Sequence, residues 1–119
     1  MTKRRNDSHS TEFGLWLREQ REIDSKDGYL ATNIDFMWSN YKTKKWMILE
    51  EKRYMSTPKR WQHGLFQILH TVCRLDPNYQ GLHLIQFEKT GPEDGKIYVN
   101  KNEVTKKELI EFLQFKRKL

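Results

Sequence analysis

The segment from Trp46 to Leu49 constrains the fold most, because four apolar residues follow one another there without a polar interruption. A strand with one face in water alternates apolar and polar residues, whereas a strand covered on both faces is apolar throughout. We therefore predict a strand over Trp46–Lys52 that is buried on both sides. A strand of this kind belongs to a sheet with helices packed against it.

The longest predicted helix follows this strand, over residues 57–75. Thr57 followed by Pro58 is typical of a helix start, with threonine as the cap and proline in the first turn. Apolar residues then recur at alternating spacings of four and three, as on one helix face, and we expect this stripe to pack on the sheet. The stripe consists of Trp61, Leu65, Ile68, Val72 and Leu75, and the opposite, polar stripe consists of Arg60, His63, Gln67, His70 and Arg74.

Shorter segments complete an order of α-β-β-β-α-β-β-α. A first helix is predicted over about residues 11–21, where Phe13, Trp16 and Leu17 form an apolar stripe. The strand over 46–52 is preceded by strands over 29–31 and 33–39, and a hairpin is formed by strands over 82–88 and 96–101. A capping box of Thr105 and Glu108 begins a last helix that extends to residue 118. The order predicts an α/β fold with a mixed central sheet flanked by helices.

Length and composition restrict the class of protein. The 119 residues suffice for one domain, predicted over residues 11–119, after a flexible basic tail over residues 1–10. A single cysteine excludes a disulfide scaffold, and no apolar run is long enough for a secretory signal or a membrane span, so we expect a cytoplasmic protein. A net charge of +6 with 13% aromatic residues favours a nucleic-acid partner.

Two carboxylates come together in the hairpin predicted from the strands over 33–39 and 46–52. We place the turn of this hairpin at residues 42 and 43. Met37 then pairs with Ile48, and Asp35 lies opposite Glu50. Like charges directly across a strand pair are destabilising. A divalent cation between the two carboxylates would make the pair stabilising instead of destabilising, because hard cations take oxygen ligands.

Lys52 joins this pair, because side chains two residues apart in a strand share a face. Magnesium held by two carboxylates lowers the pKa of a bound water, and a nearby ammonium stabilises developing negative charge, which is what phosphodiester cleavage requires. The same acid-x-Lys pattern occurs at Asp94 and Lys96, but there it falls in a predicted turn. Surface charges at strand ends are the alternative interpretation of Asp35, Glu50 and Lys52.

Asp35, followed fifteen positions later by Glu50-Glu51-Lys52, resembles the motif of the PD-(D/E)xK nuclease superfamily. The predicted element order over residues 11–88 is also similar to its restriction-endonuclease-like core. The resemblance implies a Mg²⁺-dependent deoxyribonuclease, in which Mn²⁺ can substitute, with Asp35 and Glu50 as metal ligands and Lys52 as the catalytic lysine.

Two further site residues follow from members of that superfamily. Glu12 on the first helix resembles the additional glutamate of Holliday-junction resolvases, with Glu19 as the second choice. Gln62 resembles the glutamine of RecB-type nuclease domains, although Phe66 stands where those carry tyrosine. A helix-border glutamine without a role is the alternative for Gln62.

The partner expected from these residues is DNA, whether duplex, branched or single-stranded. A homodimer is expected if both strands of a duplex are cut symmetrically, since a lone small domain carries one site. Two other functions compete with the nuclease: a non-catalytic nucleic-acid-binding module and a small protein-interaction domain on the same scaffold.

Overall fold

The computed structural model describes residues 12–29 and 33–119, which fall into two compact units divided after Asn33. The first unit contains helix α1 (Glu12–Glu19) and two 3₁₀ turns, η1 (Arg21–Ile23) and η2 (Ser25–Asp27). In α1, Leu15 is buried, whereas Phe13 and Trp16 are exposed and stack on each other. The predicted tail over residues 1–10 lies outside the described residues, as does most of the strand predicted over 29–31; Tyr29 itself is not in a strand.

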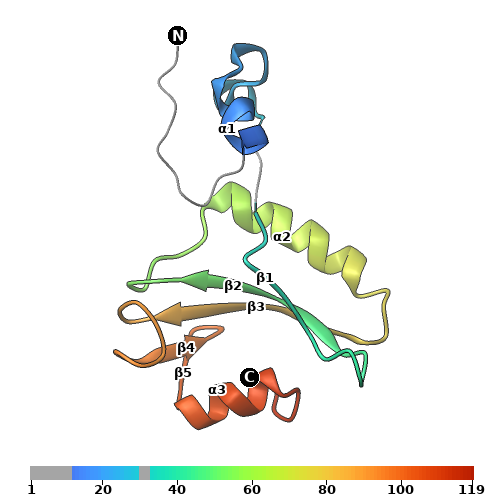
Figure 1. The fold of residues 1–119 in the computed structure, drawn as a ribbon, viewed down its shortest axis with the longest axis vertical. Coiled ribbons are helices and arrows are strands. Elements are labelled where there is room, and N and C mark those ends of the chain that lie inside the picture. Colours follow the sequence, from blue (N-terminus) through green and yellow to red (C-terminus); the bar gives the residue numbers. More distant parts are fainter. Residues whose placement is uncertain (1–11, 30–32) are drawn as a thin grey trace. The chain divides into compact units, whose positions relative to one another are not determined.

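The second unit is a mixed α/β structure built on one five-stranded sheet. The strands are β1 (Phe36–Ser39), β2 (Trp46–Lys52), β3 (Tyr79–Phe87), β4 (Ile97–Val99) and β5 (Asn102–Val104), and they lie side by side in chain order. β2 and β3 are parallel and the other neighbours are antiparallel. Helix α2 (Arg60–Cys73) lies on one face of the sheet and α3 (Lys106–Leu113) on the other (Figure 1).

The prediction that β2 is buried on both faces is confirmed. Met47, Ile48, Leu49 and Glu50 are each at most 5% exposed. Met47 and Leu49 pack toward α3 in the main hydrophobic core. The rest of that core consists of Ile85, Phe87, Ile97, Val99, Val104, Leu109 and Phe112. Because side chains alternate along a strand, Ile48 and Glu50 face α2 instead.

Helix α2 is present, but the prediction of its packing face is wrong. The helix begins at Arg60, and the residue before it, Lys59, makes no side-chain capping hydrogen bond. Thr57 and Pro58, which were predicted to start the helix, therefore precede it. The expected apolar stripe is exposed, and the side turned to the sheet carries Gln62 and the buried Phe66. The physical reason lies in the sheet below, where the buried Glu50 carboxyl needs a hydrogen-bond donor that an apolar stripe would not supply.

The C-terminal third follows the prediction more closely. The hairpin of β3 and β4 is confirmed, with Phe87 opposite Ile97, although β5 follows as an additional strand. The capping box of Thr105 and Glu108 is present at the start of α3. α3 ends at Leu113 rather than near residue 118, and Phe115 beyond it adopts a left-handed φ of 61°.

A left-handed backbone conformation at Gly81, inside β3, makes room for the half-buried side chain of His83. Gly81 has a φ of 108°, and a Cβ there would lie 2.8 Å from Nε2 of His83. That ring nitrogen lies 2.8 Å from the carbonyl oxygen of Gln80, while Asn100 Nδ2 lies 2.9 Å from His83 Nδ1. Burial lowers the pKa of His83, so the ring is held neutral with Nε2 as donor and Nδ1 as acceptor.

We expect Gly81→Ala to destabilise the protein by about 1–2 kcal/mol from the left-handed backbone alone, with a further loss from the displaced ring of His83. Urea unfolding measures the change. Gly91→Ala is the matched control, since a Cβ at Gly91 would meet no atom within 4 Å and the backbone there is not left-handed. Equal effects of the two substitutions would contradict the structural role of Gly81.

Candidate functional site

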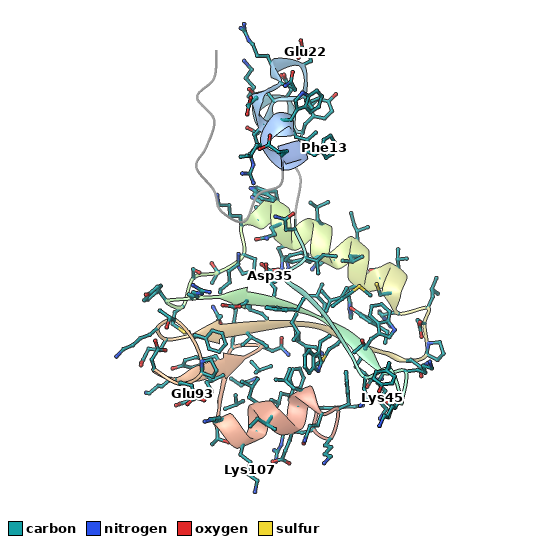
Figure 2. The ribbon with its side chains drawn as sticks, in the orientation of Figure 1. Phe13, Glu22, Asp35, Lys45, Glu93 and Lys107 are labelled. Carbon is teal, nitrogen blue, oxygen red and sulfur yellow. The ribbon has the colours of Figure 1, made fainter. Side chains whose placement is uncertain are left out.

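The hairpin of β1 and β2 has the predicted register. Met37 pairs with Ile48 and Trp38 with Met47. Asp35 immediately precedes β1, so continuing the register by one residue places it opposite Glu50. The Asp35 carboxylate oxygen Oδ2 accepts a 2.8 Å hydrogen bond from the backbone N–H of Glu51, which fixes the side chain at this end of the hairpin (Figure 2).

Glu50 is a buried carboxyl, only 3% exposed. Its pKa is raised to about 7, first because burial penalises the charged form and then because the Asp35 carboxylate repels it. The carboxyl group of Asp35 therefore lies close enough to Glu50 to disfavour its charged form.

Lys52 lies on the same face of β2 as Glu50 and opposes the rise in the pKa of that residue. Its Nζ lies 3.3 Å from Glu50 Oε1, and the lysine side chain is 23% exposed. The ammonium lowers the pKa of Glu50 through hydrogen bonding and charge, but less than burial and Asp35 raise it. The site thus joins two carboxyl groups to one cation that still reaches solvent.

Gln62 reaches the site from the first turn of α2. Its Nε2 lies 3.5 Å from Glu50 Oε1, so the amide is at the outer limit of a hydrogen bond to the carboxyl. This contact brings together the glutamine and the acid that the sequence singled out, although the catalytic role of Gln62 stays a prediction.

The sequence interpretation missed Gln86, which is 3% exposed and lies opposite Lys52 on β3. Its Nε2 donates a 2.9 Å hydrogen bond to the carbonyl oxygen of Ser56, in the loop that follows Lys52. The only sequence signal was a glutamine inside the apolar run of β3. In that loop Tyr54 and Met55 have left-handed φ values of 54° and 58°, so the chain leaves the site through a strained turn.

A small, hard cation would suit the carboxyl pair, because its positive charge would offset the repulsion between the two groups. Asp35 and Glu50 are the residues that would hold Mg²⁺ or Mn²⁺, since both offer carboxylate oxygens. Within residues 12–29 and 33–119, no group of three or more His, Cys, Asp or Glu side chains gathers into a metal centre. Two protein carboxylates leave ligand positions for water and phosphate, as is usual for magnesium.

Other charged residues lie apart from this pair, or their part in the site stays a prediction. Glu12 and Glu19 belong to α1 in the first unit, and their part in the site stays a prediction. Lys42 and Lys44 are exposed in the β1–β2 turn, at the opposite end of the hairpin from Asp35. The basic residues that follow the site along the chain are instead Arg53, Lys59 and Arg60, all of them exposed.

In comparisons with known proteins, the chain matches no family model, no curated protein and no solved structure. Among the helices of the described residues, none combines the length and the apolar character that crossing a bilayer requires. We therefore infer the function from the geometry of the site itself.

The raised pKa of Glu50 gives the metal-free protein a specific pH dependence. The protonated carboxyl of Glu50 contributes to the free energy of unfolding. This contribution is fully present below about pH 4.5 and is lost as the pH rises through about 7. We expect Glu50→Gln to raise the melting temperature near pH 8, by roughly 4–8 °C for each kcal/mol recovered, and to change it little near pH 5. Thermal melts in EDTA at the two pH values measure this.

Glu51→Gln is the matched control, because Glu51 is the next residue, lies on the other face of β2 and pairs with Arg53 at the surface. It should leave the pH profile of the melting temperature unchanged. If Glu50→Gln instead lowers the melting temperature near pH 8, Glu50 is a stabilising ion-pair partner of Lys52 and the account of the site is wrong.

Proposed function

We propose that the protein is a metal-dependent nuclease that hydrolyses DNA phosphodiester bonds with Mg²⁺, for which Mn²⁺ can substitute. One observation carries the proposal: the exposed Asp35 stands opposite the buried Glu50 at the end of the β1–β2 hairpin, with Lys52 on the same face of β2 as Glu50. When both carboxyl groups are ionised their repulsion costs stability, and a divalent cation held between them would offset that cost.

The residues have distinct roles in this proposal. Asp35 and Glu50 hold the metal ion, which lowers the pKa of a bound water and polarises the phosphate. Lys52 is the only site residue with a positive charge, and its exposed end orients the attacking water or stabilises charge that develops on the phosphate. Gln62 and Gln86 are positioning residues, the first for Glu50 and the second for the loop after Lys52.

The arrangement of the second unit supports the resemblance to the PD-(D/E)xK superfamily. An antiparallel pair, β1 and β2, carries the acids, and α2 then crosses to β3, which is parallel to β2. This is the part of the restriction-endonuclease-like core on which the motif depends. The assignment of the chain to that superfamily is part of the proposal.

DNA is the proposed substrate because of the charge around the site. The net charge is +6, and the exposed Arg53, Lys59 and Arg60 lie in the segment between Lys52 and Gln62. Cations in this position would bind the phosphates that flank the scissile bond, and such binding weakens steeply with salt.

We expect divalent-dependent cleavage of DNA that Asp35→Asn, Glu50→Gln or Lys52→Met each reduces by about 10²-fold or more, because each removes a preorganised charge at the reacting phosphate. Incubation of plasmid, linear duplex, single-stranded and branched DNA with Mg²⁺ or Mn²⁺ measures the rates. Asp94→Ala and Lys96→Ala alter the same pattern where it recurs in a turn, and both variants should retain full activity. Equal losses at the turn and at the site would contradict the choice of residues.

Metal binding should also compete with the proton on Glu50. We expect excess Mg²⁺ to raise the melting temperature more near pH 8 than near pH 6, because below about pH 7 the cation must displace a proton. Thermal melts with and without metal measure the gain, and Glu50→Gln should lose most of it. A gain that is independent of pH, or that survives in Glu50→Gln, would place the metal elsewhere.

A further inference from the structure

The exposed face of α2 carries an apolar stripe that the second unit leaves uncovered. Five large apolar side chains follow one side of the helix and its C-terminal extension, and each is between 42% and 85% exposed. They are Trp61, Leu65, Ile68, Val72 and Leu75. Figure 2 shows side chains of α2 projecting on the side turned away from the sheet. An apolar surface of this length is unusual for a face that stays in water.

The stripe is symmetric about its midpoint to within one residue. Ile68 stands at the centre, Trp61 and Leu75 each lie seven residues away, and Leu65 and Val72 lie three and four residues away. In an antiparallel helix pair with a two-fold axis at Ile68, that residue meets its own copy. Trp61 then meets Leu75 of the other copy, and Leu65 lies about 1.5 Å along the axis from the level of Val72. A surface that is self-complementary in this way fits a second copy of the chain.

Gly64 gives an independent reason for a close partner. It lies inside α2 beside the stripe, where glycine costs about 0.5–1 kcal/mol relative to alanine. A Cβ there would meet nothing within 4 Å, and Gly64 has no left-handed φ, so no contact in the described residues requires a glycine. A glycine would let a second helix approach more closely at this point, because the distance between helix axes depends on side-chain size at the contact.

The charges around α2 agree with a partner of the same kind. The cationic residues of the helix, Arg60 and Arg74, belong to the opposite stripe, so pairing does not bring them together. Gly64 and Thr71 border the apolar stripe on its outer side and carry no charge. Residues 1–10, which contain Met1 as their only large apolar residue, are too polar to cover the stripe themselves.

We propose that α2 pairs with α2 of a second copy in an antiparallel homodimer centred on Ile68. The stripe extends about 21 Å along the helix, and a pair of this length buries less than the roughly 800 Å² per partner of a standard stable interface. The dimer is therefore expected to dissociate in the micromolar range. It does not depend on the proposed nuclease activity, and Glu50→Gln should dimerise like the parent.

Disulfide trapping in the full chain tests this pairing, after Cys73→Ser removes the natural thiol. Under mild oxidation, Ile68→Cys should form a covalent dimer, because the two-fold axis brings the two thiols together. Gln67→Cys, one residue away on the polar stripe, is the matched control and should stay monomeric. Leu65→Cys mixed with Val72→Cys should cross-link far more than either variant alone, which distinguishes the antiparallel pair from a parallel one.

Sedimentation of the unmodified chain gives the complementary measurement. It should show a reversible monomer–dimer equilibrium that Ile68→Lys shifts to monomer and that Gln67→Lys leaves unchanged. Because Ile68 is 64% exposed, its substitution should leave the melting temperature of the monomer unaltered. A chain that stays monomeric at high micromolar concentration, or equal cross-linking at positions 67 and 68, would overturn the proposal and assign the stripe to another occupant.

Discussion

The burial of one carboxyl group, that of Glu50 on β2, organises the second unit. A carboxylate that is 3% exposed must be neutralised or given donors, and two side chains meet this demand. Lys52 approaches along the same strand and Gln62 approaches from α2, whereas Asp35 opposes the charged form. The resulting pKa of about 7 leaves Glu50 divided between its two protonation states near neutral pH, where it can exchange a proton for a cation.

The same requirement explains the orientation of α2. With Gln62 and Phe66 turned toward the sheet, the stripe centred on Ile68 must lie to one side, because its residues stand roughly a quarter turn or more away around the helix. The helix therefore has three faces: one supports the buried carboxyl, one is basic and polar, and one is apolar and unpaired in the described residues of the second unit. The helix thus contributes Gln62 to the proposed catalytic site and the apolar stripe to the proposed dimer. Neither proposal depends on the other.

The sequence predicted those parts of the fold that depend on local signals. The uninterrupted apolar run predicted β2, a turn centred on residues 42 and 43 predicted the hairpin register, and the capping box located the start of α3. The packing face of α2 was not predictable in this way, because periodicity identifies an apolar face without saying what covers it. Gln86 was missed for a related reason, since its role depends on a loop carbonyl thirty residues away in the chain.

The most direct test is the titration of Glu50 itself, followed by NMR of its ¹³C-labelled side-chain carboxyl with and without Mg²⁺. The account predicts a pKa of about 7 in the metal-free protein, because burial and Asp35 outweigh Lys52, and a marked fall when the metal binds. Asp35→Asn should lower the metal-free value by removing the repelling charge. An ordinary glutamate pKa that neither Mg²⁺ nor Asp35→Asn changes would contradict the account.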